Sequence, residues 1–288
     1  MRKKRYGFIF FLIPIFLLLV VFRYYPLFSA VYHSFTTWNV ISSKFVGFQN
    51  YVLLFKDNLF IASLRNIFIY ILVSIIIITV MAIIGAELIF NLRSKLSAFW
   101  KYLFVVPMIV PYTVFILIWK FIYNPYLGIL NGSLNLIGLS SLTQPWLGSP
   151  QTALYAVAFV GFPFFSTAQF LVILSSLQNL DRSILESAKL DGATTLKRVF
   201  KIDLPLIMDK IVLIIILTII WNFQAFTNFY LLTFGGPGSS TLVPGLYLYQ
   251  MAFENNSMGY ACAIGVIMAI IALILVFITQ KIEQLIIK

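Results

Sequence analysis

The sequence predicts an all-α, polytopic membrane protein with about six transmembrane helices. Hydrophobic residues make up 61% of the chain and charged residues only 10%, whereas a soluble domain needs far more charge to cover its surface. In lipid, a spanning backbone must satisfy its hydrogen bonds within a helix or a closed barrel. The apolar runs here are long and unbroken, which favours helices over the alternating strands of about ten residues found in barrels.

Six stretches reach the roughly 20 apolar residues that a helix needs to cross the hydrocarbon core. They cover residues 7–31, 67–91, 99–123, 152–177, 207–233 and 259–280. The second contains an acid, Glu87, but residues 68–86 hold twelve Phe, Ile, Leu or Val. Those twelve favour insertion by about 5 kcal/mol, against a penalty of about 3 kcal/mol for a central acid, so the span is retained.

The first stretch has a second interpretation as a secretory signal peptide. The basic run "RKKR" precedes it, and Ser29 and Ala30 offer small residues for cleavage. Five further spans follow, and residues 23–25, Arg-Tyr-Tyr, are typical of an interfacial belt. We therefore interpret it as the first transmembrane helix.

The positive charges predict the orientation. With the N-terminus inside, fifteen of the twenty Lys and Arg lie on the cytoplasmic side. The chain is thus predicted to be a multi-pass protein of the plasma (inner) membrane with both termini in the cytoplasm. The net charge of +11 does not indicate nucleic acid, because the basic residues lie between apolar runs and not on one soluble face.

The connections between the spans predict one transmembrane domain, residues 1–288, without a separate soluble domain. The external segment 32–66 contains the single histidine, His33, which is more typical of a surface residue than of a metal ligand. Segment 124–151 has no charged residue and suits a compact loop on the outer membrane face. The single cysteine, Cys262, excludes an internal disulfide and is expected to be a small apolar residue. No metal site is predicted.

The polar connection of about residues 178–206 is patterned as a cytoplasmic helical hairpin. Ser183 to Glu186 reads as a capping box, and Gly192 then ends the first helix. Thr194 or Thr195 can cap the second helix, and Pro205 is predicted to stop it. Apolar residues on both helices, such as those in 196–202, predict either a docking surface or a hairpin that lies in the headgroup layer.

The hairpin sequence "ESAKLDGATTLKRVFKIDLP" resembles the E-A-A, D-G-A and I-x-L-P signature of permease subunits in ATP-binding-cassette importers. Ser187 replaces the usual Ala. Further segments resemble the maltose and glycerol-phosphate branch, in its first-permease form. They are "FTTWN", "FVGFQNYVLLF", "FVVPMIVPYTVFILIWKFIYNPYLGILN", "GFPFF", "LLTFGGPGSSTLVPGLYLYQMAF" and "GYACAIGV", in the family's order.

The resemblance implies that the hairpin couples the chain to a separate ATPase. The implied coupling residues are Glu186, Ser187, Ala188, Asp191, Gly192, Ala193, Ile202, Leu204 and Pro205. It also implies a second permease subunit, two ATPase subunits and an extracellular solute-binding protein as partners, with membrane lipid around the chain and a sugar as substrate. The chain itself has no G-x-x-x-x-G-K-[ST] phosphate loop. No cofactor is therefore expected in this chain, and ATP and Mg²⁺ would be bound by the partner ATPase.

Polar residues of the fifth span are candidates for the substrate path, because polar groups inside a bilayer are costly. On a helical wheel, an arc of about 160° holds Thr218, Trp221, Asn222, Gln224 and Asn228. Amides and hydroxyls beside an aromatic ring suit a sugar, but the same residue types also join helices by hydrogen bonds. Chemistry alone leaves the two interpretations equal.

The resemblance favours the path and adds the turn Gly161, Phe162, Pro163 and Phe164 to it. Other amides of the family's sugar site are replaced here by Val157 and Ala225, so the specificity is altered. Pro107, Pro111 and Pro163 free backbone groups within spans, which is consistent either with plain kinks or with a direct role.

The predicted function is therefore a non-enzymatic permease subunit of an ATP-driven sugar importer. The alternative is an ion-coupled secondary transporter or channel, a class that places ionisable residues in mid-membrane. Glu87, Arg23 and Lys120 come nearest to that, and each lies near the end of its span. A membrane enzyme is disfavoured because the sequence shows no nucleophile with a base and no metal-ligand cluster.

Overall fold

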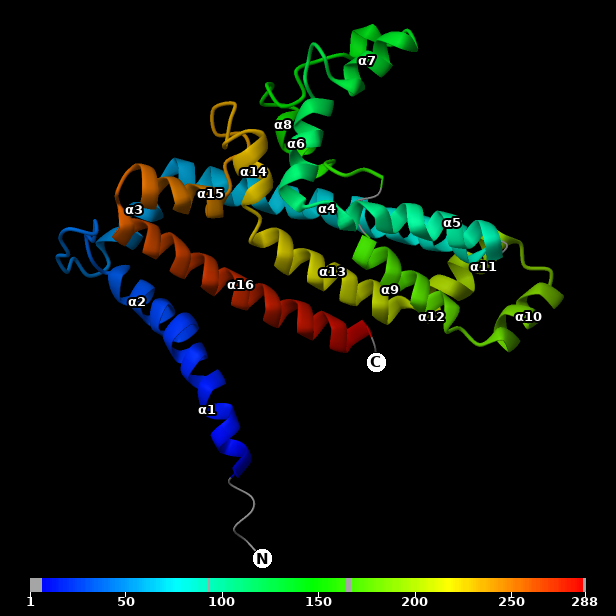
Figure 1. Cartoon of the computed structure of the whole chain (residues 1–288), viewed down its shortest axis with the longest axis horizontal. Helices are drawn as coiled ribbons and strands as arrows, with labels where there is room; N and C mark the ends of the chain where they lie inside the picture. Colours follow the sequence, from blue (N-terminus) through cyan, green and yellow to red (C-terminus); the bar gives the residue numbers. More distant parts are fainter. Residues whose placement is uncertain (1–6, 93, 164–166, 287–288) are drawn as a thin grey trace, which may run out of the picture. The chain divides into compact units, whose positions relative to one another are not determined.

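The computed structural model describes residues 7–92, 94–163 and 167–286 (Figure 1). Within these residues the only β pairing is an antiparallel bridge between Thr36 and Phe45, so the predicted all-helical class is confirmed. The α-helices are α1 (Gly7–Leu19), α2 (Tyr25–His33), α3 (Gln49–Leu54), α4 (Asn58–Phe90), α5 (Ser94–Val105), α6 (Tyr112–Ile122), α7 (Ile129–Leu136), α8 (Ala153–Ala158), α9 (Thr167–Gln178), α10 (Arg182–Leu190), α11 (Thr195–Arg198), α12 (Leu204–Leu206), α13 (Met208–Phe223), α14 (Thr227–Leu232), α15 (Pro244–Tyr249) and α16 (Met258–Ile286).

Five shorter turns complete the helical structure. Three are wide π-helical turns, Val20–Tyr24, Val199–Asp203 and Gln250–Glu254, and two are 3₁₀ turns, Val106–Ile109 and Ser140–Leu142. The chain divides into two compact units: residues 1–61 with 244–271, and residues 62–243 with 272–288.

The first unit is organised around a buried asparagine in the predicted external segment. The Asn50 side chain donates hydrogen bonds to the carbonyls of Ser34 (2.8 Å) and Thr36 (2.9 Å). The start of α16 packs against the segment 34–38, because the Gly259 N–H donates to the Trp38 carbonyl (2.8 Å). A Cβ at Gly259 would lie 2.0 Å from the Thr36 carbonyl oxygen, so only glycine permits this approach.

His33 belongs to this packing and is not an isolated surface side chain. Its ring stacks on that of Trp38, with the ring centroids 4.1 Å apart, and it is partly buried. The segment that the sequence predicts only as an aromatic external loop is thus a hydrogen-bonded structure.

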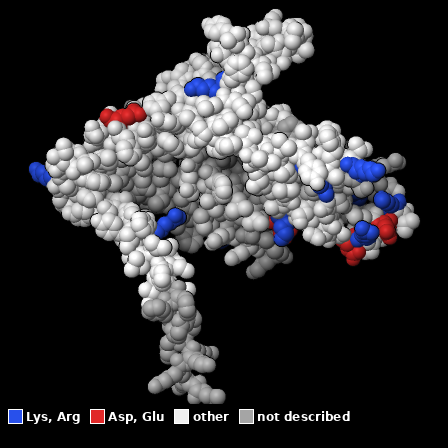
Figure 2. All heavy atoms as spheres, in the orientation of Figure 1, with Lys and Arg blue, Asp and Glu red and all other residues white. Residues whose placement is uncertain are grey.

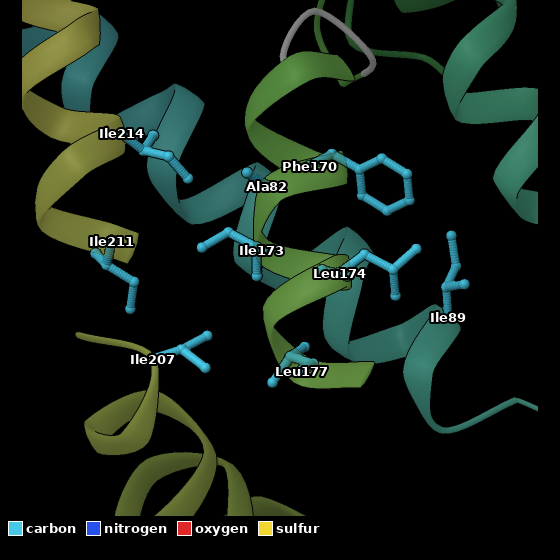
Figure 3. Packing of buried hydrophobic residues seen from close by; sticks show 10 residues of the cluster. Ala82, Ile89, Phe170, Ile173, Leu174, Leu177, Ile207, Ile211 and Ile214 are labelled. Atoms are coloured by element: carbon cyan, nitrogen blue, oxygen red, sulfur yellow. The ribbon is translucent and has the colours of Figure 1, made fainter. Parts of the chain in front are cut away.

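The core of the second unit lies among α4, α9 and α13 (Figure 3). Figure 3 shows Ala82 and Ile89 of α4, Ile207 just before α13, and Ile211 and Ile214 within α13. From α9 it shows Phe170, Ile173, Leu174 and Leu177. Since lipid tails are as apolar as Leu, close fit between side chains stabilises such a core more than removal from water does. This core fixes the end of the unit from which the hairpin α10–α11 projects.

Among the residues that the structure describes, three helices are long and apolar enough to cross a membrane: Leu12–His33, Asn58–Phe90 and Met258–Ile282. They correspond to the first, second and last predicted spans. Two further apolar pairs, Lys95–Ile109 with Tyr112–Ile122 and Thr195–Leu206 with Met208–Phe223, are bent by 100° and 71°. The multi-pass helical architecture is confirmed, but several predicted spans are not single straight helices.

The third predicted span breaks at its prolines. Val110 precedes Pro111 and is extended (ψ 129°), as the steric restriction on a residue before proline requires. The chain therefore leaves the 3₁₀ turn around Pro107 and restarts as α6 in a new direction. The chain thus changes direction at Pro107 and Pro111, and a direct role of these prolines in the solute path stays a prediction.

The fourth and fifth predicted spans are also interrupted. α8 ends at Ala158 and α9 begins at Thr167, so residues 152–177 do not form one described helix. α13 ends at Phe223 and α14 begins at Thr227, so residues 207–233 form two helices. Hydropathy predicts the length of an apolar run, but it does not predict whether the run is continuous.

Segment 124–151 is the compact loop that the sequence predicts. The Asn131 amide donates to the carbonyls of Pro125 and Gln144 (both 3.1 Å), and the Trp146 indole N–H donates to Asn131 Oδ1 (2.7 Å). One buried asparagine thus holds the loop closed without any charged residue.

Candidate functional site: the polar hairpin between α9 and α13

The first hairpin helix, α10, begins two residues earlier than the capping box predicts. The N-cap is Asp181, whose carboxylate accepts a hydrogen bond from the Ser183 N–H (2.9 Å). That hydrogen bond holds the pKa of Asp181 below its usual value. The predicted Ser183–Glu186 capping box is therefore wrong, because an aspartate two residues earlier, a strong N-cap residue, already satisfies this helix terminus.

Gly192 ends the first helix as predicted. Its φ is +68°, and the Ala193 N–H donates to the Ala188 carbonyl (3.0 Å) while the Gly192 N–H donates to that of Lys189 (3.1 Å). This is a Schellman-type C-terminus, which requires a left-handed residue. A Cβ at Gly192 would meet nothing within 4 Å, so the space beside it is open.

The second hairpin helix begins at Thr194, whose hydroxyl accepts from the Lys197 N–H (3.4 Å). The prediction that Pro205 stops this helix is wrong. α11 continues through the wide turn Val199–Asp203 into α12, and the 71° bend falls at Ile207. Pro205 lies at the first positions of α12, where its missing N–H is tolerated.

The hairpin exposes large apolar side chains together with charged ones. Leu190, Leu196 and Phe200 are 89%, 71% and 67% exposed. Figure 2 shows basic and acidic side chains gathered at the end of the second unit where α10 and α11 lie. Such a mixed surface is typical of a protein docking site.

A shallow depression of about 320 Å³ lies on the hairpin, and some of the predicted coupling residues line it. Ser187, Ala188, Asp191 and Ile202 line it, together with Ser183 and Ile184. Ala188 is buried; Glu186, Gly192 and Pro205 are exposed; Ala193 and Leu204 are half-buried. The two hairpin helices thus bring four of the nine predicted coupling residues to one depression.

Beneath the hairpin lies a buried ionic cluster that the sequence analysis missed. The Arg198 Nε donates to Asp203 Oδ2 (2.9 Å), and its Nη2 donates to Asn91 Oδ1 (2.7 Å). The same Nη2 lies 3.9 Å from Glu87 Oε2, and the guanidinium carbon lies 5.6 Å from the Phe90 ring centroid. The available signal was an acid near the end of a span that leads into a basic loop. Spacing alone does not pair residues 107 positions apart, as Asn91 and Arg198 are.

The predicted substrate-path residues do not form one helical face, because α13 ends at Phe223. Thr218 is buried and bonds to the Ile214 carbonyl within its own helix (2.8 Å). Asn228 is buried in α14, accepts from the Tyr112 hydroxyl and lies 3.4 Å from that of Tyr70. These two residues are engaged in packing within the unit.

The remaining members of the predicted path are more accessible. Trp221 is 78% exposed, Gln224 is exposed, and Asn222 is half-buried. The Asn222 Nδ2 has no hydrogen-bond partner among the described residues. Gly161 (φ +94°) is buried between α8 and α9, and Phe164 lies outside the described residues. Contact of these residues with a solute stays a prediction.

Comparison with known proteins finds a family model and several relatives that match most of this chain. Residues 78–288 match the family model described as "Binding-protein-dependent transport system inner membrane component". The probable ABC transporter permease protein YurN of Bacillus subtilis is 36% identical over 276 residues, covering 94% of each chain. The multiple sugar-binding transport system permease protein MsmF of Streptococcus mutans is 31% identical, covering 93% of this chain and 92% of the relative.

A solved structure shares the fold at low sequence identity. A chain of a bacterial alginate ABC transporter, solved in complex with an alginate pentasaccharide-bound periplasmic protein, is 22% identical to this chain. The TM-score is 0.85, and the match covers 99% of this chain and 96% of the other.

Proposed function

Because this chain belongs to the family of binding-protein-dependent transport system inner membrane components, we propose that it imports a sugar or short oligosaccharide as one permease subunit of an ATP-driven transporter. The chain is a component of membrane transport and not an enzyme. It works as a multi-pass membrane protein, and residues 1–288 would act as one transmembrane permease domain.

The observation that carries the proposal is the exposed hairpin surface around Gly192. The sequence lacks a phosphate loop, so in this proposal the energy comes from a separate subunit that binds ATP and Mg²⁺. A helix pair with exposed Leu190, Leu196 and Phe200 beside a shallow depression offers that subunit a place to dock. Glu186 of α10 and Gly192, which follows that helix, are both exposed and would lie in the contact with the ATPase.

The complete importer would contain a second, similar permease, two ATPase subunits and an extracellular solute-binding protein. Fifteen of twenty basic residues on one side support a cytoplasmic position for the hairpin and for both termini in the plasma membrane. ATP binding would draw the two hairpins together and switch the solute cavity between inward-facing and outward-facing states as a rigid-body alternation.

The chemistry of the solute follows from the accessible residues at the end of α13. Trp221 would offer a flat apolar face to the C–H face of a sugar, and the exposed Gln224 amide would offer hydrogen bonds to its hydroxyls. The name of the relative MsmF, a multiple sugar-binding transport system permease, supports a carbohydrate.

The test is uptake by the complex reconstituted in liposomes with its solute-binding protein and a panel of labelled sugars. We expect uptake that requires ATP and continues when an ionophore collapses the ion gradients. Uptake that continues without ATP and stops with the ionophore would replace the proposal with an ion-coupled transporter. Failure of any ATPase subunit to co-purify with the chain would also contradict it.

A further inference from the structure

The buried ionic cluster joins two elements that the proposed function has to move together. Arg198 and Asp203 belong to the hairpin, whereas Glu87 lies in the last turn of α4 and Asn91 directly follows that helix. The guanidinium uses different nitrogens for the two sides: Nε for Asp203 (2.9 Å) and Nη2 for Asn91 (2.7 Å). Arg198 therefore bridges the two elements, with a hydrogen bond to each of them.

The contact on the α4 side acts on the end of the helix itself. The Asn91 Nδ2 donates to the Glu87 carbonyl (2.7 Å) and lies 3.3 Å from Glu87 Oε2. Asn91 thus satisfies a carbonyl of the last helical turn while its Oδ1 accepts from Arg198. A displacement of Arg198 would therefore pull on Asn91 and so on the C-terminal end of α4. This helix runs unbroken for 33 residues from Asn58 to Phe90.

Burial makes this bridge sensitive to geometry. Asp203, Glu87 and Arg198 are 0%, 7% and 8% exposed. Two carboxylates face one guanidinium, and Glu87 Oε1 and Asp203 Oδ1 have no hydrogen-bond partner among the described residues. Removal of Arg198 alone would leave two buried carboxylates without a cation, so the cluster tolerates little displacement of that side chain.

We propose that Arg198 is a positioning residue that makes α4 move with the coupling hairpin, so that ATPase-driven motion of the hairpin reaches the membrane-spanning part. This inference rests on the proposed function. It differs from a purely stabilising role, because a stabilising ion pair affects how much complex assembles and a coupling bridge affects how much solute is moved per ATP.

The first variant, Arg198→Lys, keeps the positive charge but lacks the forked guanidinium that contacts two partners at once. The second combines Glu87→Gln, Arg198→Met and Asp203→Asn, which removes every charge of the cluster and so avoids a buried unpaired ion. Lys210→Met is the matched control, because Lys210 pairs with its neighbour Asp209 (2.7 Å) at the half-exposed start of α13, away from the cluster. All variants are made in the full chain and reconstituted with the partner subunits.

The measurements are ATPase subunit bound per permease and solute imported per ATP hydrolysed. We expect wild-type ATPase association in every variant, an import ratio about tenfold lower in the triple variant, and an intermediate ratio in Arg198→Lys. The Lys210→Met ratio should equal that of the wild type. A wild-type ratio in the triple variant would overturn the inference and leave the proposed function intact. Absence of ATPase association in the wild-type chain would instead contradict the proposed function itself.

Discussion

Gly192 has a left-handed backbone conformation and open space beside it. Substitutions can test separately whether the conformation or the open space matters for function. The left-handed φ of +68° disfavours residues with a Cβ, by about 1 kcal/mol, although Asn tolerates it better than most. Nothing within 4 Å would contact the new Cβ. A bulky residue would thus disturb the isolated chain only slightly, and any larger effect would come from a partner.

We predict that Gly192→Asn retains most uptake and that Gly192→Leu abolishes it, while both insert into the membrane at wild-type levels. The bulky side chain would occupy space that a docked ATPase needs. Co-purification of the ATPase with each variant measures the effect directly. Equal ATPase binding by the Leu and Asn variants would show that the space beside Gly192 does not belong to the interface.

Asp57, just before α4, predicts a dependence of stability on pH. Its carboxylate accepts hydrogen bonds from the Tyr247 and Tyr260 hydroxyls and from the Leu59 N–H (2.9 Å). Burial alone would raise the pKa of Asp57, but these hydrogen bonds hold the pKa below its usual 3.8. The ionised form is therefore favoured in the folded protein. Its stabilisation is complete above the unfolded pKa and disappears as the pH falls through the lower folded pKa.

We expect the thermal unfolding temperature of the detergent-solubilised chain to fall between about pH 5 and pH 3, and to fall less in Asp57→Asn. Glu254→Gln is the control, because Glu254 is an exposed carboxylate of the same unit. If Asp57→Asn and the wild type show the same decrease, the carboxylate of Asp57 does not contribute to the pH dependence.

Local chemistry explains which residue features the sequence could predict. The glycine at 192 and the threonine cap at 194 depend only on neighbouring backbone, and both are confirmed. The N-cap of α10 is mispredicted, because Asp181 and Ser183 are both good caps and spacing does not rank them. Asn66, whose amide donates to the Ser239 and Leu242 carbonyls (2.8 and 2.9 Å), bonds to residues more than 170 positions away, and no local pattern indicates it.

At the scale of helices, the break between α13 and α14 divides the polar residues of the fifth predicted span into two groups. Asn228 lies in α14 and is bonded to the hydroxyls of Tyr70 and Tyr112. Trp221 lies in the last turn of α13, Gln224 directly follows that helix, and both are exposed. The sequence could predict the polar composition of this span. It could not predict the break, since Gln224–Phe226 contain neither proline nor glycine.

We predict opposite phenotypes for the two groups. Asn228→Leu should lower the free energy of unfolding by about 1–3 kcal/mol, because it leaves the Tyr70 and Tyr112 hydroxyls without their shared partner. Trp221→Ala should change the stability by less than about 0.5 kcal/mol, because the side chain is 78% exposed. It should nevertheless raise the sugar concentration needed for half-maximal uptake.

Thermal unfolding in detergent and concentration-dependent uptake are the two measurements for this pair. Unchanged uptake in Trp221→Ala would place the solute path away from the end of α13. A loss of uptake in Asn228→Leu without loss of stability would assign Asn228 to the path and not to packing.

For the whole molecule, hydropathy and charge predict different properties. Apolar length predicts a multi-pass helical chain, and three uninterrupted helices bear this out. The same measure treats broken and continuous runs alike, so it misses the bends of 100° and 71° that redirect the chain. The orientation of the chain across the membrane is predicted from the distribution of Lys and Arg and not from hydropathy, so it is tested by a separate experiment.

We predict that the hairpin and the segment after α2 lie on opposite sides of the membrane. Leu190→Cys and Ile41→Cys suit labelling, because the native side chains are 89% and 94% exposed. Cys262 is first replaced by Ala so that each variant carries one thiol. A membrane-impermeant maleimide should label Ile41→Cys in intact cells and Leu190→Cys only in inside-out vesicles. In the inside-out vesicles, ATPase subunit added to the medium should slow the labelling of Leu190→Cys, because it would cover the hairpin. Labelling of Leu190→Cys from outside would invert the charge-based topology and would leave the hairpin unable to contact a cytoplasmic ATPase.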